Sequence, residues 1–456
     1  MNKNRKIKLV ALALLSSIGT SVTAEQTDLL SVYQQALTND TQYKISEANL
    51  RSTEQNVRIS RSNLLPQISA SATFNKRDTD FEPAGLDGSP STPFNQDRQT
   101  TTYRLDLRQV IFDWSQWVAL DQAEMRLRVS ELNHAASLQN LMIRTSQAYF
   151  NVLSAEENLD ITKAEKQALE QQLSFTREQY ESGLANSTDF LDAQANYDQS
   201  LANVVSLENS LQIAKESLRE ITGQYYMELE GIGDDVTMSQ PSPNNIDDWM
   251  RVAREANLGL KAQQMNVRVA RKDIKRNQSG HYPTVNFNAD YTDNETDTTR
   301  TASGSSIDSL DLSDGYSASI TFSVPLFSGF RTTAQTEQAK QNYLSNTHQL
   351  EQQDRLVQRN ARNAFNALQA SILSFEANKR AVDSSSGSLE ATREGYQAGT
   401  RNIVDVLRAT RSLYAAKRNL TRAKYDYLIN SLRLKEAAGT LTEEDVTSVN
   451  QWLKQY

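Results

Sequence analysis

The sequence predicts an internally duplicated chain of mixed α and β structure, with an outer-membrane β-barrel continued by a long α-helical coiled-coil barrel. Three observations indicate this fold class. Segments recur about 216 residues apart, four stretches alternate apolar and polar residues, and two helical stretches run for about 68 residues. Each half carries the same series of a helix, a strand pair, a very long helix and a return helix. The chain would supply four strands, and a trimer twelve.

The first 24 residues have the pattern of a secretory signal peptide. Four basic residues precede the apolar run Leu9–Leu15, and Val22-Thr23-Ala24 is a small-residue cleavage site. The apolar run is far shorter than the ~20 residues of a spanning helix, which argues against an N-terminal anchor. Cleavage removes four of 48 basic residues and none of the 56 acidic ones, leaving a net charge of −12. No later apolar run reaches 18 residues, so only strands could cross a membrane.

The composition excludes several classes of function. The chain has no cysteine, which excludes disulfides, thiolate metal sites and cysteine nucleophiles. His134, His281 and His348 are far apart and form no metal motif, so surface positions explain them best. The acidic net charge argues against a nucleic-acid partner. We therefore predict no catalytic residues, no metal and no cofactor.

The two halves of the chain match at nearly constant spacing. Tyr180-Glu-Ser-Gly183 corresponds to Tyr396-Gln-Ala-Gly399 at an offset of 216, and Leu65-Pro66 corresponds to Tyr282-Pro283 at 217. The predicted divisions are a signal peptide at 1–24, a first repeat at 25–232, an equatorial linker at 233–245, a second repeat at 246–439 and a C-terminal equatorial segment at 440–456.

Four segments have the period-two alternation of strands with one apolar and one polar face. They are Ile68–Phe74, Tyr103–Leu107, Val285–Tyr291 and Tyr316–Val324. Two soluble hairpins are the alternative interpretation. Thr79–Thr100 and Asp293–Asp314 are predicted to be long outer loops, as outer-membrane barrels have. Four strands cannot close a barrel, and an open sheet would leave unpaired edges in lipid. Two copies would give eight strands and a filled interior, so three copies are favoured.

The helices are predicted in matching lengths. The long ones are Asp113–Tyr180 and Gly329–Tyr396, each roughly 100 Å at ~1.5 Å per residue. The short ones are about half as long, so two should stack end to end beside a long one. We expect Asp28–Asn63 to stack on Val404–Ala438, and Thr188–Thr222 on Ile246–Gly280. Apolar spacings of three, four and seven predict coiled-coil seams from Leu138 to Tyr180 and from Ala361 to Tyr396. A plain two-helix coiled coil is the alternative.

The turns between helices carry a specific resemblance. Gly399-Thr-Arg401-Asn-Ile-Val-Asp405-Val-Leu, Thr410–Lys417 and Tyr425–Asn430, together with Gly183-Leu184 and Thr188-Asp189, closely resemble the TolC family of outer-membrane efflux proteins. The likeness covers Glu25 to Tyr456. It implies a homotrimer in the outer membrane of a Gram-negative bacterium, reaching into the periplasm as a helical tunnel.

The resemblance also implies function and partners. Such a duct serves multidrug efflux and type I protein secretion, is passive, and is gated at its periplasmic helical tip. It opens on docking to a periplasmic adaptor protein and an inner-membrane pump of the resistance-nodulation-division, ABC or major facilitator type. The tip turns Gly183-Leu184 and Gly399-Thr400 would face the adaptor. Two other classes, a trimeric surface adhesin and an exported enzyme, fit less well: adhesin strands lie together at the C-terminus, and no nucleophile–base set is apparent.

The family pattern places the gate at the tip. Tyr396 and Arg401 match the positions that tie the inner coiled coil to its neighbours, and Thr188 and Asp189 match their partners. The alternative is that these four are ordinary polar groups at helix ends. Weak bonds of this kind suit a gate that a docking partner must open.

One position departs from the family pattern. Relatives often carry two aspartate rings, three residues apart, in the constriction. Asp405 fits the first, but Arg408 occupies the second, and its repeat equivalent is Asp192. We hypothesise that Arg408 pairs with Asp192 or Asp405, which leaves one acidic ring and weakens cation selection.

An aromatic cluster marks the strand-to-helix transitions. It consists of Phe112, Trp114, Trp117, Phe327 and Phe330. Two interpretations stay open: an aromatic girdle at the membrane interface, or packing that plugs the junction between barrel and tunnel.

Overall fold

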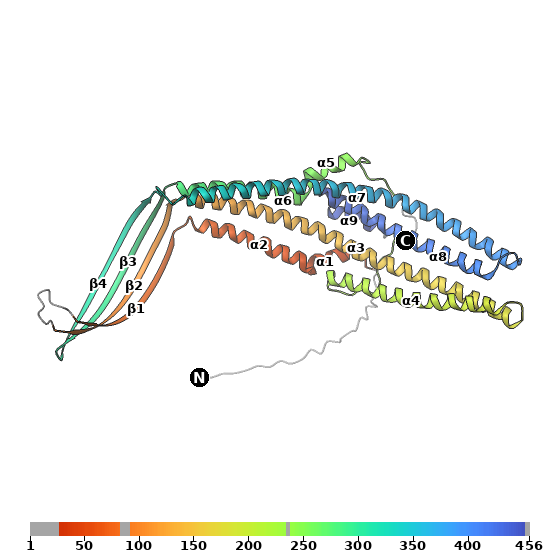
Figure 1. Ribbon diagram of the computed structural model, residues 1–456, viewed down its shortest axis with the longest axis horizontal. Coiled ribbons are helices and arrows are strands. Elements are labelled where there is room, and N and C mark those ends of the chain that lie inside the picture. Colours follow the sequence, from red (N-terminus) through yellow and green to blue (C-terminus); the bar gives the residue numbers. More distant parts are fainter. Residues whose placement is uncertain (1–26, 83–91, 234–237, 452–456) are drawn as a thin grey trace, which may run out of the picture.

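The computed structural model describes residues 27–82, 92–233 and 238–451. The predicted signal peptide and parts of the two equatorial segments lie outside these ranges. The chain is elongated, with a four-stranded sheet at one end and two helical hairpins at the other (Figure 1). None of the described helices combines the length and the apolar character needed to cross a membrane.

The sheet is an antiparallel meander in the order β1-β2-β3-β4. Its strands are β1 (Gln67–Phe81), β2 (Phe94–Phe112), β3 (Thr284–Ala302) and β4 (Ser305–Ser323). The register places Ile68 opposite Leu107, and Leu107 opposite Ala289, so the apolar residues of neighbouring strands share one face. Ser69 and Asp106 lie opposite each other on the other face. The predicted amphipathic sheet is confirmed, and β1 and β4 are its two unpaired edges.

The predicted long outer loops are wrong in extent. Within 79–100, β1 runs to Phe81 and β2 begins at Phe94, and residues 83–91 of this predicted loop lie outside the described ranges. β3 and β4 continue through most of 293–314 and are joined by Ser303 and Gly304 alone. Both residues have positive φ, 50° and 82°, as a tight two-residue hairpin requires. Asp, Asn and Thr in this stretch resemble a loop in composition. However, the main-chain ladder between adjacent strands satisfies the backbone whatever the side chains are.

The helices run side by side in rows along the long axis of the chain (Figure 1). The long rows are α3 (Trp114–Glu181) and α7 (Arg331–Gln397). The remaining helices are α1 (Leu29–Asn39), α2 (Thr41–Ser62), α4 (Ser187–Thr222), α5 (Ile246–Ala256), α6 (Leu258–Gln278), a short 3₁₀ turn at Ser279–His281, α8 (Ile403–Ala438) and α9 (Glu443–Gln451). α2 and α4 lie along one side of α3, while α6 and α8 lie between α3 and α7.

The stacking predicted from sequence is therefore wrong. The α1/α2 pair meets α4 rather than α8, through α1, and the α5/α6 pair meets α8 rather than α4, through α5. The Asn39 amide donates to the Thr222 carbonyl at 2.9 Å in the first junction, and the Asn257 amide donates to the Ala437 carbonyl at 3.3 Å in the second. Each glycine turn folds a return helix back onto the long helix before it, so consecutive elements stay neighbours.

Each predicted first helix is in fact two helices. The breaks fall at Asp40 and Asn257, which cap α2 and α6 by accepting bonds from Tyr43 N at 2.7 Å and Leu260 N at 3.0 Å. Arg144 of α3 fixes the first break, since its guanidinium donates to both oxygens of buried Asp40 at 3.0 and 2.9 Å. The duplication is confirmed in detail: α4 and α8 both have 36 residues and end at glycines with φ 73°.

The coiled-coil seams are also confirmed. Leu141, Val152, Leu159 and Leu169 of α3 are buried, as are Ala361, Phe365, Leu368 and Leu389 of α7. Tyr180 is the exception: it is 44% exposed and stacks on Phe190 of α4 with ring centroids 5.6 Å apart. On α3 the buried seam thus ends before Tyr180, whereas Tyr396 at the end of the α7 seam is half-buried.

Candidate functional site

The tip consists of two helical hairpins with the same turn. Gly183 N donates to Tyr180 O at 3.0 Å and Leu184 N to Gln179 O at 2.8 Å. In the second hairpin, Gly399 N donates to Tyr396 O at 3.0 Å and Thr400 N to Gly395 O at 2.8 Å. This pair of bonds is a Schellman motif, and it needs the positive φ that both glycines adopt. Leu184 is 80% exposed, so the first turn presents an apolar side chain to solvent.

Tyr396 joins the two hairpins. Its hydroxyl donates to the Gln179 side-chain oxygen at 2.9 Å, and its ring meets Phe175 edge-on at 6.4 Å. Both partners belong to α3, so the contact ties α7 of the second hairpin to α3 of the first. Farther from the turn, Leu169 of α3 packs into a cluster with Leu389 and Leu407. Sequence reasoning missed Gln179. Its repeat equivalent is Gly395, which has no side chain, so the duplication gives no signal for this bond.

The structure places Asp189 near Tyr396, but within the described residues it gives the side chains of Thr188 and Arg401 no polar partner. Burial raises the pKa of the Tyr396 phenol, and the negative charge of Asp189 raises it further. Arg401 is exposed, and its stem lies over Gly395, where a Cβ would come within 2.8 Å of Arg401 Cγ. Within the described ranges, neither Thr188 nor Arg401 makes a side-chain hydrogen bond or ion pair.

The constriction residues lie at the start of the return helices. Asp405 and Asp189 are the acidic residues in the first turns of α8 and α4, where the helix dipole favours a carboxylate. Asn402 caps α8 by accepting from Asp405 N at 2.9 Å. Arg408 lies on the exposed side of α8. In the described part of one chain it forms no ion pair with Asp192 or Asp405, so such a pair could form only between chains.

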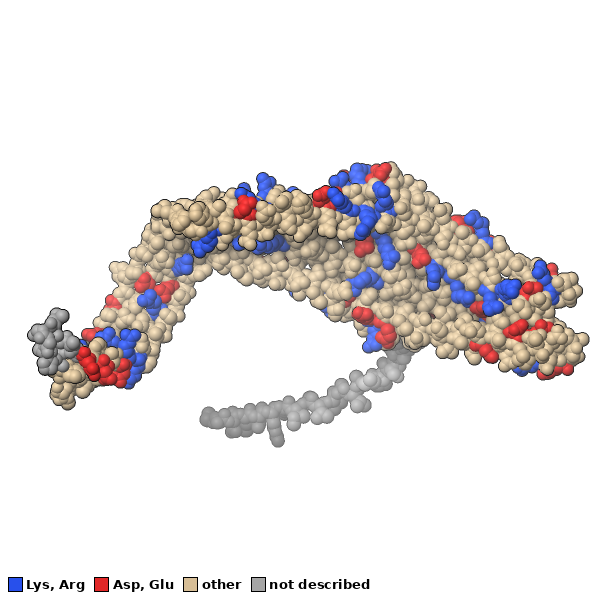
Figure 2. Space-filling view, in the orientation of Figure 1, with Lys and Arg blue, Asp and Glu red and all other residues tan. Residues whose placement is uncertain are grey.

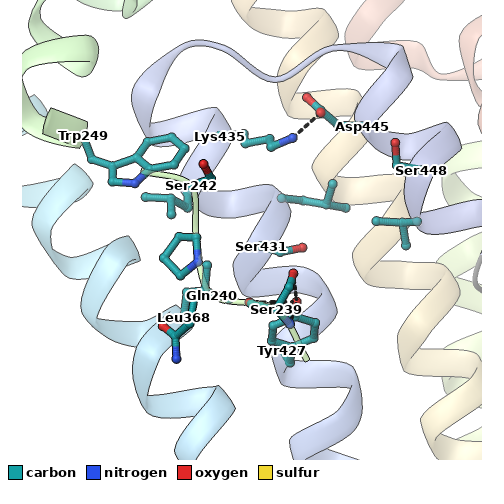
Figure 3. Close-up of a pocket in the computed structure, with 14 residues that line it drawn as sticks. Ser239, Gln240, Ser242, Trp249, Leu368, Tyr427, Ser431, Lys435, Asp445 and Ser448 are labelled. Carbon is teal, nitrogen blue, oxygen red and sulfur yellow. Dashed lines mark hydrogen bonds and ion pairs between the residues drawn. The ribbon is translucent and has the colours of Figure 1, made fainter. Parts of the chain in front are cut away.

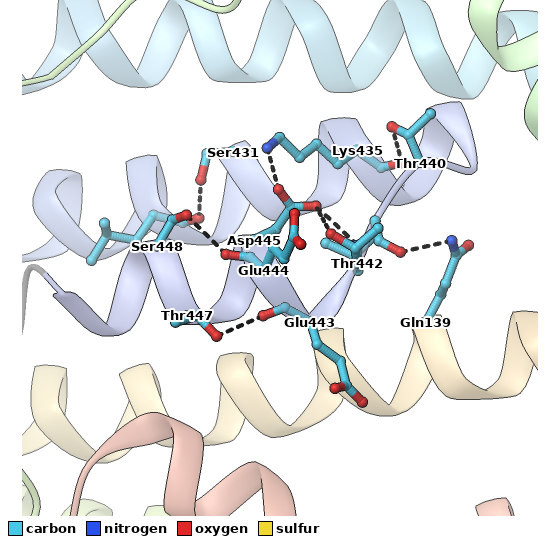
Figure 4. Close-up of polar contacts among 12 residues, drawn as sticks. Gln139, Ser431, Lys435, Thr440, Thr442, Glu443, Glu444, Asp445, Thr447 and Ser448 are labelled. Atoms are coloured by element: carbon cyan, nitrogen blue, oxygen red, sulfur yellow. Dashed lines mark hydrogen bonds and ion pairs between the residues drawn. The ribbon is translucent and has the colours of Figure 1, made fainter.

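Residues 239–245 and 440–451, which we call the belt, pack against the helical body. α9 docks on α8 through an ion pair between Lys435 and Asp445, and Asp445 also accepts from Thr442 N at 2.9 Å (Figure 4). Gln139 of α3 donates to the Leu441 carbonyl at 3.0 Å. These contacts fix the C-terminal helix to both halves of the chain.

The belt contains a cavity of about 290 Å³ between α8, α9 and residues 239–242 (Figure 3). Trp249, Leu368 and Val449 line its apolar side. At one end the Tyr427 hydroxyl accepts from Ser239 N at 3.0 Å, and the Trp249 indole donates to the Pro243 carbonyl at 2.8 Å. These two bonds fasten residues 239–243 of the linker to α8 and α5, which is a structural role.

The aromatic cluster at the strand-to-helix transitions is largely exposed in the single chain. Trp117 is 52% exposed, and Phe327 and Phe330 are 76% and 73% exposed, with their rings edge-on at 5.5 Å. This exposure shows that the cluster does not fill the interior of its own chain. Both earlier interpretations therefore require contact with lipid or with another chain.

Comparison with known protein families divides the chain into the same two halves. The model of the outer membrane efflux protein family matches residues 32–224 and 249–440. The chain is 36% identical over 450 residues to outer membrane protein TolC of Vibrio cholerae, covering 98% of each protein. It is 27% identical over 457 residues to the proteases secretion protein PrtF of Dickeya chrysanthemi, covering 99% of this chain and 96% of that one.

Solved structures of outer-membrane channels have the same fold. The crystal structure of the Campylobacter jejuni CmeC outer membrane channel superposes with a TM-score of 0.73 at 16% identity, covering 99% of this chain and 98% of that one. A similarity at this identity bears on the fold alone. The sequence matches extend over both repeats and nearly the whole length, and they show that the chain belongs to the outer membrane efflux protein family and resides in the outer membrane of a Gram-negative bacterium.

Proposed function

We propose that three copies of this chain close into a passive exit duct for multidrug efflux and type I protein secretion, gated at the helical tip. The open edges of the sheet carry the proposal. β1 and β4 each have one unpaired side, and apolar residues such as Ile68 and Phe322 are 69% and 66% exposed. Lipid does not tolerate unpaired strand edges. Pairing β1 of one copy with β4 of the next removes every edge, and three copies make twelve strands.

The helical rows support the same closure. The row of α2 and α4 forms one edge of the body, and α7 forms the other. Both edges expose apolar side chains: Ile59 is 60% exposed, Val205 60% and Leu373 69%. Joining the α2/α4 edge of one copy to α7 of the next buries these residues and continues the wall below the barrel.

The tip would act as the gate. The Tyr396–Gln179 bond holds the second hairpin against the first, and a single neutral hydrogen bond is worth only about 1 kcal/mol. Three such bonds per trimer resist spontaneous opening without preventing a docking partner from opening the tip. Arg401, Thr188 and Asp189 would add contacts between chains, and Asp405 would form the acidic ring of the constriction.

The names of the relatives support secreted proteins as cargo. PrtF is named for protease secretion and TolC is an outer membrane protein of the same family. A periplasmic adaptor would contact the exposed turns at Gly183-Leu184 and Gly399-Thr400. The inner-membrane pump would be of the resistance-nodulation-division, ABC or major facilitator type. The duct would have no catalytic activity and no cofactor of its own.

Disulfide trapping tests the closure directly, because the chain has no cysteine. Ser71→Cys on β1 is combined in turn with Gly315→Cys, Ser317→Cys or Ser319→Cys on β4. At least one pair should give a covalent trimer on oxidation, with either single variant remaining monomeric in denaturing gels. Ladders that stop at dimers, or an absence of cross-links in all three pairs, would contradict three-fold closure.

A further inference from the structure

The outer half of the sheet separates charge by face. The even-numbered residues of β1 and the odd-numbered residues of β2 continue the apolar face of Ile68 and Leu107, and in this half of the sheet they include three carboxylates, Asp78, Asp80 and Asp97. Lys76 pairs with Asp97 at 3.0 Å on this face, and Asn95 donates to Asp78 and Asp80 at 2.6 and 2.9 Å. The odd-numbered residues of β1 and the even-numbered residues of β2 lie on the other face, which turns away from lipid toward the lumen of the proposed duct.

Three arginines gather on the lumen face of this outer half. Arg77 of β1 lies directly opposite Arg98 of β2, and Arg300 of β3 lies diagonally from Arg98, beside Gln96. Directly opposite residues have Cβ atoms roughly 5 Å apart and diagonal ones roughly 7 Å. Both charge signs are visible at this end of the molecule (Figure 2).

The surroundings leave the arginines without carboxylate partners. In the described part of the chain, none of the three forms an ion pair, and Asp311 is the one acidic residue of this face in strand segments 73–81, 94–102, 294–302 and 305–313. Arg300 lies over the Phe94 ring at 4.7 Å, and Phe94 stacks on Phe81 at 4.8 Å. The aromatic pair therefore positions one guanidinium without neutralising it.

Like charges opposite each other on a sheet cost stability unless an anion lies between them. The outward carboxylates cannot reach across the strand plane to supply one. A multivalent anion in the lumen could accept hydrogen bonds from guanidinium groups on adjacent strands at once, which is the geometry that guanidinium groups offer to phosphate.

We infer that Arg77, Arg98 and Arg300 of three chains form an anion-binding ring just inside the outer mouth of the duct, for phosphate-bearing or other multivalent anions. The inference rests on the proposed trimeric closure, which brings the three sets together around one axis. The ring opposes in sign the acidic ring proposed at the tip, so the two ends of the duct would select for different ions. Anionic cargo would be concentrated at the exit, and small anions would be held there.

Single-channel recording with inorganic tripolyphosphate tests the ring. The protein is added to one chamber of a planar bilayer; because the polar helical body cannot cross lipid, the sheet end faces the other chamber. Tripolyphosphate in that other chamber should block the wild-type current. Arg77→Gln and Arg98→Gln should each weaken the block by about tenfold, since each removes charge-assisted hydrogen bonds.

Lys76→Gln is the matched control, because it removes one positive charge from the adjacent residue on the opposite face. Its block should equal that of the wild type. Absence of wild-type block, equal block in all variants, or equal weakening by Lys76→Gln and Arg77→Gln would each overturn the ring while leaving a conducting duct. A wild-type protein that does not conduct would instead overturn the duct itself, and the ring with it.

Discussion

Removing the hydroxyl of Tyr396 should open the tip. In Tyr396→Phe the ring still packs against Phe175, but the bond to Gln179 at 2.9 Å is lost. A neutral hydrogen bond contributes about 1 kcal/mol, so hairpins that open independently gain about fivefold in the open population. If the three chains open together, the loss is about 3 kcal/mol per trimer, or about 150-fold.

The repeat supplies a matched control. Tyr180 is the equivalent of Tyr396 in the first hairpin, and its hydroxyl makes no hydrogen bond in the described part of the chain. Single-channel recording should show higher open probability for Tyr396→Phe and wild-type behaviour for Tyr180→Phe. Gln179→Leu combined with Tyr396→Phe should add little to either single change. Equal effects of the two tyrosine variants, or full additivity with Gln179→Leu, would refute this account of the gate.

Four further changes have defined outcomes. Gly439→Ala should lower stability by about 1–3 kcal/mol more than Gly223→Ala in thermal unfolding. Both glycines have φ 73°, but only at Gly439 would a Cβ lie 2.6 Å from a backbone atom. Equal losses of stability in the two variants would show that the backbone at Gly439 can move away. Burial would raise the pKa of Asp40, but bonds from Arg144 and Tyr43 N outweigh it and hold the pKa below its usual value. Its ion pair should therefore stabilise the fold at neutral pH and lose this effect as the pH falls below 3.8 and through the lowered pKa, so Asp40→Asn should cost about 2–4 kcal/mol at pH 7 and progressively less as the pH falls below 3.8. Burial raises the pKa of Glu436, so its ionisation opposes folding as the pH rises, and Glu436→Gln should raise the unfolding temperature at pH 7 but not at pH 4. Arg408→Asp should increase the cation preference of the channel measured by reversal potential, and an unchanged preference would exclude a role for Arg408 in selectivity.

Local signals predicted the repeated features well. Gly183 and Gly399 mark the turns between helices in the sequence, and both adopt the positive φ that a helix C-terminus with this motif needs. The alternation of apolar and polar residues set the faces of the sheet because its period fixes side-chain direction. Helix breaks at Asp40 and Asn257 had a readable signal too, since both are favoured capping residues. However, the apolar periodicity continues across both breaks, so each stretch has the sequence pattern of a single helix.

Long-range placement could not be read from the same signals. Which short helix stacks on which depends on contacts such as Asn39 with Thr222, between residues 183 positions apart. The polar outer half of the sheet was mistaken for loops because composition does not report main-chain pairing. The contact of Tyr396 with Gln179 depends on how two hairpins cross at the tip, and neither residue type nor spacing indicates it.

The central claim is that this chain becomes a pore only by sharing its wall with identical copies. Electron microscopy of detergent-purified protein tests it most directly. Projections along the long axis should show three-fold symmetry around a hollow centre, and side views should show a barrel continued by a helical tube. Particles of one chain, or rings of two-fold symmetry, would contradict the account.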